Sequence, residues 1–157
     1  MTLVAEYRDA RRGEEVARLR RVLALRAMAA IGTSQREMAE ALGVSQPAIS
    51  QQLKSTLDLS RVHPEVLVEA AAPILRRVAE ERGFTNLAVF GSVARRKARP
   101  DSDIDLLVEA PPGTTIGGLL SMQDLLERIL GRAVDLITYG GLNARLDGDI
   151  RSEAVLL

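Results

Sequence analysis

Two aspartates separated by a single residue, Asp103 and Asp105, have the spacing in this sequence that points most directly to chemistry. They begin the segment 103–108, whose run of Ile, Leu and Val predicts a buried strand. Side chains alternate between the two faces of a strand, so both carboxylates should lie on the same face. Neighbouring carboxylates repel each other, and a bound cation relieves this repulsion. The pair therefore predicts a Mg²⁺ site, since Mg²⁺ takes one or two protein carboxylates and fills its shell with phosphate oxygens.

A Gly-Ser pair and a third aspartate extend this prediction. Gly91 and Ser92 follow a predicted strand over 85–90 and offer backbone N–H groups and a hydroxyl to a phosphate. Asp135 lies in another short apolar run, 133–138. Three acids on strands beside a Gly-Ser turn indicate a metal-dependent phosphoryl-transfer site.

Two of these acids also have a purely structural interpretation. Asp103 could belong with Asp101 to a solvated turn, and Asp135 could lie on a wet edge of the sheet. Asp105 is enclosed by apolar residues, where an acid is costly unless it is paired or ligated. This environment favours the functional interpretation.

The same residues carry a resemblance to a known family. The resemblance is carried by Phe90, Gly91 and Ser92 and, after ten intervening residues, by Asp103, Ile104 and Asp105. This spacing resembles the signature of the nucleotidyltransferase superfamily of the DNA polymerase β type. Residues 91–106 are similar, more narrowly, to the minimal nucleotidyltransferases (MNT) that act as antitoxins beside HEPN-domain toxins. The resemblance covers roughly residues 64–157, and the segment 150–155 resembles the last helix of that family. Arg96 departs from it, since the family often has Gly there.

The resemblance implies a substrate, a metal and a partner. By it, two Mg²⁺ ions would be held by Asp103, Asp105 and Asp135, and ATP would be the substrate. The residues expected to hold the nucleotide are Gly91, Ser92, Arg95 and Lys97. Arg95 and Lys97 belong to a predicted basic helix over 93–98, which could also be an ordinary solvated helix. The family implies transfer of AMP to a hydroxyl, that of a tyrosine, on a cognate HEPN-type ribonuclease toxin.

A second functional unit is predicted closer to the N-terminus. Ser34 and Glu37 form a capping box at the start of one short helix, and Ser45 caps the next helix after a turn at Gly43. The stretch 35–53 resembles a helix-turn-helix of the Cro/phage-repressor type, whose second helix enters the major groove of DNA. Gln side chains suit adenine, whereas Ser and Lys suit phosphates. The residues expected to contact DNA are Ser45, Gln46, Ser50, Gln51, Gln52 and Lys54.

A helical hairpin used for protein contact is the alternative for this unit. The Gln and Ser side chains on one exposed face favour DNA. The apolar residues Met38, Ala39 and Leu42 should form an apolar stripe behind the capping box, with Val44 buried in the corner of the turn. Because one such unit makes few phosphate contacts, we expect a homodimer or a higher complex on operator DNA.

Composition and charge set wider limits. The chain has 157 residues, no cysteine and 46% hydrophobic residues. The absence of cysteine suits a reducing compartment, and no run approaches twenty apolar residues, so we expect a cytoplasmic protein without membrane contact. Residues 1–61 carry 10 Lys/Arg against 7 Asp/Glu, and residues 62–157 carry 11 against 14. This asymmetry weakly favours nucleic acid for the first part, although ordinary solvated faces give the same pattern.

The expected fold class is α+β. An all-α helix-turn-helix bundle is predicted over 1–60, and a small nucleotidyltransferase domain with a three- to four-stranded mixed sheet over 64–157. Pro73 should kink or divide a helix over 64–82. The residues after Gly141 should form a final helix.

Three functions are compatible with these observations. The leading hypothesis is a DNA-binding antitoxin that modifies its partner with AMP and represses its own operon. The alternative is a transcriptional regulator whose nucleotidyltransferase domain only binds nucleotide or a partner protein; the presence of all three carboxylates argues against it. Modification of small molecules, of the aminoglycoside type, is disfavoured because the chain lacks room for an additional substrate-binding domain.

Overall fold

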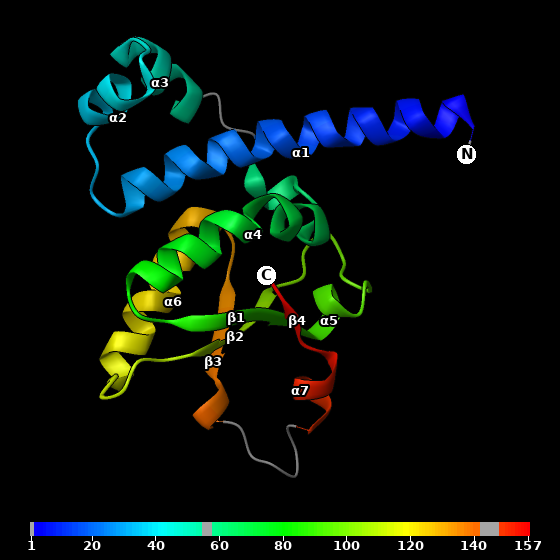
Figure 1. Cartoon of the computed structure of the whole chain (residues 1–157), viewed down its shortest axis with the longest axis vertical. Coiled ribbons are helices and arrows are strands. Elements are labelled where there is room, and N and C mark those ends of the chain that lie inside the picture. The colour runs from blue at the N-terminus through cyan, green and yellow to red at the C-terminus, as the bar shows by residue number, and fades with distance from the viewer. Residues whose placement is uncertain (1, 55–57, 142–147) are drawn as a thin grey trace.

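A computed structural model describes residues 2–54, 58–141 and 148–157 (Figure 1). Its elements are α1 (Leu3–Ala30), α2 (Gln35–Leu42), α3 (Gln46–Lys54), a 3₁₀ turn (Leu59–Arg61), α4 (Pro64–Glu81), β1 (Thr85–Phe90), α5 (Gly91–Ala94), β2 (Ile104–Glu109), α6 (Ile116–Leu130), β3 (Val134–Thr138), a second 3₁₀ turn (Tyr139–Gly141), α7 (Gly148–Glu153) and β4 (Val155–Leu156). Residues 55–57 of the predicted first domain and 142–147 of the predicted final helix lie outside the described residues.

The sheet is mixed and has the strand order β3-β2-β1-β4. Strand β2 is parallel to β3, whereas β1 is antiparallel to both β2 and β4. This confirms the α+β class with a four-stranded mixed sheet. The expectation of a helix up to the C-terminus is wrong for the last residues, because Val155 and Leu156 pair with β1 instead.

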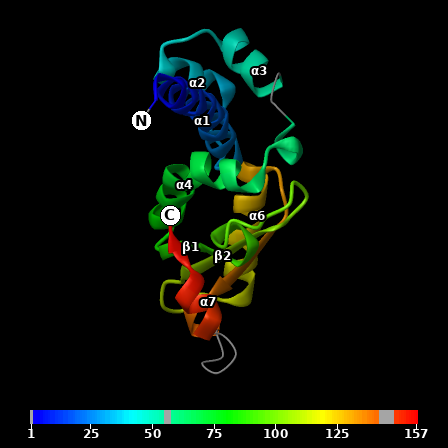
Figure 2. The same cartoon turned by 90° about the vertical axis from the view of Figure 1, so that its right-hand side faces the viewer.

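The two faces of the sheet have different neighbours. Helices α4 and α6 cover one face, and α7 lies on the opposite side (Figures 1 and 2). Alternate residues of β2, namely Ile104, Leu106 and Val108, belong to the main hydrophobic core with residues of α4 and α6. By the alternation of a strand, Asp105 points to the other face, toward the side of α7. The main core thus fixes the orientation of the acid.

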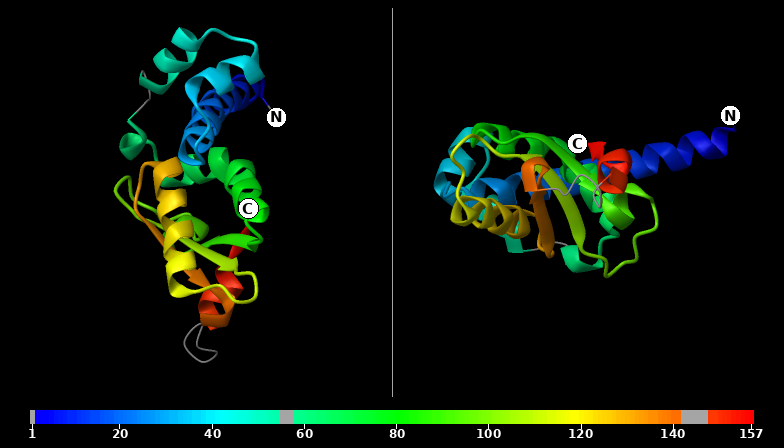
Figure 3. Two further views of the ribbon diagram at one scale, coloured as in Figure 1. Left: turned by 90° about the vertical axis from the view of Figure 1, so that its left-hand side faces the viewer. Right: turned by 90° about the horizontal axis from the view of Figure 1, so that it is seen from below.

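Helix α1 is one continuous helix that begins after Thr2, whose hydroxyl accepts a hydrogen bond from Ala5 N. It crosses above α4, and its N-terminal end projects past the rest of the chain (Figures 1 and 3). Leu23 of α1 is fully buried in the main core, whereas Leu25 is buried in a second, smaller cluster with Met38 and Ile49. Helix α1 therefore contributes to both cores, and the domain boundary near residues 60–64 stays a prediction.

Helix α4 runs through Pro73 without being divided. Proline has no N–H group, so the carbonyl of Glu69 loses its usual partner within the helix. Arg20 of α1 supplies a substitute, because its Nη2 donates to Glu69 O at 3.2 Å and its Nε donates to Ala70 O at 2.9 Å. Arg20 of α1 thus supplies a donor for the carbonyl that Pro73 leaves without one in α4.

Helices α2 and α3 have the predicted caps. Ser34 Oγ accepts a hydrogen bond from Glu37 N at 3.1 Å, and Gly43 ends α2 in the left-handed conformation with φ +67°. Met38 and Ala39 are buried as expected. The expectation that Val44 is buried is wrong, since its exposed fraction is 42%, and Leu42 of the apolar stripe is 52% exposed. The small cluster shared with α1 includes neither of these two side chains.

No helix in the described residues is both long enough and apolar enough to cross a membrane.

Candidate active site

Two of the predicted carboxylates lie side by side on neighbouring parallel strands. Asp105 of β2 and Asp135 of β3 are direct partners in the register of the pair. Neighbouring strands are about 4.8 Å apart, and residues paired in this way present their side chains on the same face. Asp105 is half-buried and Asp135 is exposed. The sheet therefore brings together two acids that are thirty positions apart in the sequence.

Asp103 lies just before the first residue of β2, with an exposed side chain. Its charge still reaches Asp105. Burial raises the pKa of the Asp105 carboxyl, and the nearby charges of Asp135 and Asp103 raise it further. Arg95 acts in the opposite direction. All three predicted acids thus contribute to one region of concentrated negative charge, with Asp105 at its centre.

Gly91 places the backbone of the Gly-Ser turn directly against Asp105. It is buried and has φ +70°, a conformation that L side chains rarely adopt. A Cβ at this position would overlap Oδ2 of Asp105 and lie 3.1 Å from its Cγ. Phe90, the preceding residue, pairs with Asp105 across β1 and β2. Glycine is therefore required here both by conformation and by space.

The remaining predicted nucleotide-binding residues follow this turn. Ser92 is half-buried in α5, whereas Arg95 and Lys97 are exposed beyond its end. The predicted helix over 93–98 is shorter than expected, because α5 ends at Ala94. Arg96 then has φ +57°. This left-handed conformation favours glycine, which agrees with the Gly that the resembling family often has at this position.

The loop that carries Asp103 is held by Arg132, a residue that the sequence prediction missed. Arg132 Nη1 donates to Pro100 O at 2.6 Å and to Ser102 O at 3.2 Å. Its Nη2 donates to three carbonyls in the segment 59–62. One guanidinium therefore joins the segment before α4 to the loop before β2. Nothing in the spacing of the sequence marks Arg132 for this role.

Glu153 is a second residue near the site that the sequence prediction missed. It is the last residue of α7 and is half-buried. Gly91 N donates to its Oε1 at 3.0 Å, and Arg95 Nη1 donates to its Oε2 at 3.0 Å. The segment 150–155 resembles the last helix of the family, but only the fold reveals that Glu153 reaches the Gly-Ser turn.

The donor set fits a Mg²⁺ ion that is shared with a substrate. Within the described ranges, no cluster of three or more His, Cys, Asp or Glu side chains is arranged to hold a metal by itself. Mg²⁺ does not need such a cluster, because it usually binds one or two carboxylates together with substrate phosphates and water. Asp105 and Asp135 offer carboxylate oxygens on one sheet face, and the negative charge around Asp105 favours a cation there.

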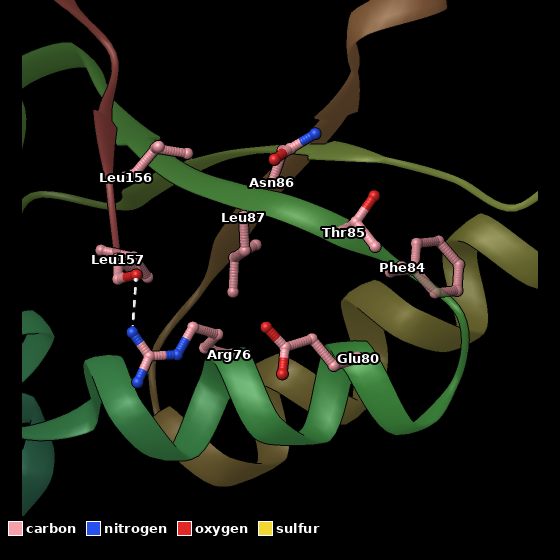
Figure 4. A pocket seen from close by; sticks show the side chains of 8 residues that line it. All are labelled: Arg76, Glu80, Phe84, Thr85, Asn86, Leu87, Leu156 and Leu157. Carbon is pink, nitrogen blue, oxygen red and sulfur yellow. Dashed lines mark hydrogen bonds between the residues drawn. The ribbon is translucent and has the colours of Figure 1, made fainter.

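Of the cavities next to the sheet, two lie on opposite faces. One, of about 140 Å³, lies between α4 and the edge formed by β1 and β4 (Figure 4). There Arg76 Nη1 donates to Leu157 O at 3.3 Å, and the lining contains none of the three predicted acids. The other, of about 460 Å³, is lined by Ala88, Glu109, Tyr139 and further residues. By strand alternation, Glu109 shares the face of Asp105, so this second cavity belongs to the same side of the sheet.

The predicted DNA-contacting residues lie on or next to α3. Ser45 Oγ accepts a hydrogen bond from Ala48 N at 3.2 Å and so caps this helix as predicted. The side chains of Ser45, Gln46, Gln51, Gln52 and Lys54 are exposed, and that of Ser50 is half-buried.

Comparison with known proteins identifies the family. A family model described as a nucleotidyltransferase domain matches residues 73–157, which is more than half of the chain. The chain therefore belongs to the nucleotidyltransferase-domain family and is a nucleotidyltransferase. The match covers the Gly-Ser turn and all three predicted acids.

Individual relatives narrow the class. A candidate protein adenylyltransferase of Methanocaldococcus jannaschii is 37% identical over 75 residues, which cover 48% of this chain and 81% of the relative. The protein adenylyltransferase MntA of Thermococcus cleftensis is 30% identical over 80 residues, covering 51% of this chain and 81% of MntA. A solved structure described as a candidate minimal nucleotidyltransferase is 35% identical, with a TM-score of 0.53, and covers 66% of this chain and 99% of that structure. The chain is thus related to protein adenylyltransferases of the minimal type.

Proposed function

We propose that this protein transfers AMP from ATP to a hydroxyl group, that of a tyrosine, on a cognate HEPN-type toxin, and thereby acts as its antitoxin. The observation that carries the proposal is the placement of Asp105 and Asp135 on adjacent strands, with the Gly91 backbone against Asp105. The names of the relatives support adenylylation of a protein. The resemblance of residues 91–106 to minimal nucleotidyltransferase antitoxins supports the toxin as the acceptor.

The proposed reaction is a single displacement at the α-phosphorus of ATP. The acceptor oxygen forms a bond to this phosphorus, the bond to the oxygen that bridges to the β-phosphate breaks, and pyrophosphate leaves. Asp135 accepts the proton of the hydroxyl, while Asp105 and Asp103 would hold Mg²⁺ and Asp135 would complete a second site. Bound Mg²⁺ would neutralise phosphate charge and lower the pKa of the attacking hydroxyl. Gly91, Ser92, Arg95 and Lys97 bind and orient the phosphates.

Label transfer from ATP tests this proposal. The purified chain is incubated with Mg²⁺, with the product of the neighbouring open reading frame and with ATP labelled on either the α- or the γ-phosphate. The proposal predicts label on the partner from α-labelled ATP alone. It also predicts loss of labelling in Asp105→Asn and normal labelling in Asp124→Asn, whose carboxylate forms an exposed ion pair with Arg128 on α6.

The outcomes against the proposal are equally specific. Label from γ-labelled ATP would indicate phosphorylation. A partner that binds tightly without label from either nucleotide would favour the regulator hypothesis, in which the fold binds nucleotide or protein without transfer.

We also propose that α2 and α3 form a helix-turn-helix with which a dimer of this protein represses its own operon. The capped turn at Gly43 and Ser45 supports this, as do the exposed Gln46, Gln51 and Gln52 on α3. Gln side chains can pair with adenine through two hydrogen bonds, each such pair contributing about 1–3 kcal/mol of discrimination.

Binding to the DNA upstream of the gene tests the operator proposal. Gln46→Ala and Gln51→Ala should weaken specific binding by about tenfold or more, without changing the weak binding to DNA of unrelated sequence. Equal affinity of the wild-type chain for both DNAs would contradict sequence recognition. Label transfer by these variants should remain normal, because α3 lies far from β2, the strand of Asp105 (Figure 1).

A further inference from the structure

The carboxylate of Glu153 occupies the groups that are proposed to bind nucleotide phosphate. Gly91 N donates to Oε1 at 3.0 Å, and Arg95 Nη1 donates to Oε1 at 3.2 Å and to Oε2 at 3.0 Å. The two donors belong to the Gly-Ser turn and to the end of α5, whereas Glu153 is the last residue of α7. Helices α5 and α7 lie next to each other in the fold (Figure 1).

This contact differs from an ordinary surface ion pair. The side chain of Glu153 is 22% exposed, and it binds a backbone N–H of the buried Gly91 as well as a guanidinium. Charge-assisted hydrogen bonds of this kind are shorter and stronger than neutral ones. The contact also adds a negative charge close to Asp105, where Asp103 and Asp135 already contribute two. The chain thus places a fourth acid at a site already rich in acids.

We propose that the Glu153 carboxylate is an internal substitute for a nucleotide phosphate and competes with ATP for Gly91 N–H and Arg95. This inference rests on the proposed function and adds a residue that sets nucleotide affinity. A carboxylate oxygen and a phosphate oxygen accept the same hydrogen bonds, and one N–H group cannot donate fully to both. Binding of ATP at this turn therefore requires displacement of Glu153. The apparent affinity for ATP equals the intrinsic affinity multiplied by the fraction of molecules in which Glu153 does not occupy the turn.

Removal of Glu153 distinguishes a competitor for the nucleotide site from a residue that positions Arg95. A residue that positions Arg95 for the reaction would weaken nucleotide binding when it is removed. A competitor has the opposite effect. The sign of the change in affinity therefore separates the two roles.

The experiment measures the affinity of the full chain for Mg²⁺ with an ATP analogue whose α,β-linkage cannot be cleaved, by calorimetry. Glu153→Ala should bind the analogue about tenfold more tightly than the wild type, since it removes a charged competitor for two donors. Glu153→Gln keeps an acceptor but loses the charge, so the affinity of this variant for the analogue should lie between those of the wild type and of Glu153→Ala. The matched control is Asp149→Asn on the same helix, which is exposed and should leave the affinity unchanged.

Thermal denaturation provides a second measurement on the same variants. Without nucleotide, Glu153→Ala should unfold at a lower temperature than the wild type, because a contact that fixes α7 is lost. The analogue should raise the unfolding temperature of Glu153→Ala by more than it raises that of the wild type. If the Ala variant does not fold, Glu153→Gln carries the comparison.

Unchanged or weaker binding by the Glu153 variants, together with normal label transfer by the wild type, would overturn this inference and leave the proposed function intact. Absence of both binding and transfer in the wild type and in the variants would overturn the proposed function as well. Binding by a variant where the wild type shows none would support complete occlusion of the site by Glu153.

Discussion

At the scale of single residues, the site depends on a close approach between a backbone and a carboxylate. Gly91 has a positive φ and leaves no space for a side chain beside Asp105. Asp105 in turn is held by the burial of its neighbours in β2 and is surrounded by other acids. The arrangement places negative charge where it is unfavourable for folding. We therefore expect some acidic residues of the site to lower the free energy of unfolding although the reaction needs them.

Gly91→Ala should strongly reduce the rate of label transfer, because the new Cβ displaces Asp105 or the turn. A displacement of about 1 Å at a reacting centre reduces rates on the order of 100-fold. The control is Gly113→Ala. Gly113 also has a positive φ, of +82°, but a Cβ there meets no atom within 4 Å. Both variants carry the backbone strain, so comparable transfer rates in the two would contradict the role of close approach.

Asp105→Asn should raise the unfolding temperature of the metal-free protein, by about 2 °C or more. The pKa of Asp105 is raised in the folded chain, so its ionised form destabilises the fold at every pH above that raised pKa. The amide removes this charge. The increase should therefore be present at neutral pH and disappear as the pH falls below the ordinary pKa of an aspartate. A lower unfolding temperature at pH 7 would contradict this account; the exposed Asp101→Asn is the control.

At the scale of elements, arginine side chains of one element donate hydrogen bonds to backbone carbonyls of another. Arg20 of α1 donates to the carbonyl of Glu69, which Pro73 leaves without its usual partner in α4, and to the neighbouring carbonyl of Ala70. Arg26 of α1 donates to Arg128 O and Ile129 O at the end of α6, and its burial lowers the pKa of its guanidinium. Arg132 holds the loop before β2. These contacts join α1 to α4 and to α6, and Arg132 fixes the loop that carries Asp103.

Arg20→Met should lower the free energy of unfolding by about 1–3 kcal/mol, because it leaves the carbonyls of Glu69 and Ala70 without a charged donor. Met retains an apolar chain of comparable length, so the change removes mainly the hydrogen bonds. The control is Arg21→Met on the same helix, whose side chain is exposed. Chemical denaturation measures both; equal effects would show that the carbonyls at Pro73 need no such donor.

Much of this organisation follows from the sequence, and the exceptions have physical reasons. The alternation in 103–108 predicted a strand with Asp105 on the face opposite Ile104 and Leu106, and the core contains these two residues. The pairing of Asp105 with Asp135 could not be read from spacing, since strand order is a long-range property. Val44 was misplaced because a corner between two helices is buried only when a further element covers it. Glu153 was missed because its contacts span 58 and 62 positions of the chain.

At the scale of the whole molecule, α1 connects the two predicted functions. It contributes Leu23 to the main core, which includes residues of α4, α6 and the sheet, and Leu25 to the cluster with α2 and α3. These side chains are only two positions apart, yet they serve different clusters. The helix therefore allows each cluster to be weakened separately.

Leu25→Ala should weaken operator binding and leave label transfer close to the wild-type rate, since it opens a cavity beneath α2 and α3. Leu23→Ala should instead destabilise the catalytic core by about 2–5 kcal/mol, as buried Leu→Ala substitutions do. Fluorescence anisotropy with operator DNA and label transfer measure the two effects. Equal loss of both activities in both variants would show that the two clusters act as one unit.

In the proposed function, this chain adenylylates a hydroxyl of the partner protein and needs Asp105 and Asp135 to do so. Mass spectrometry of the intact partner, after incubation with this chain, ATP and Mg²⁺, tests it most directly, with fragmentation to locate the modified residue. We predict a mass increase of one or more adenylyl groups on tyrosine, which is lost with Asp105→Asn and with Asp135→Asn. An unmodified partner in a stable complex with the wild-type chain, or equal modification by the Asn variants, would contradict the claim.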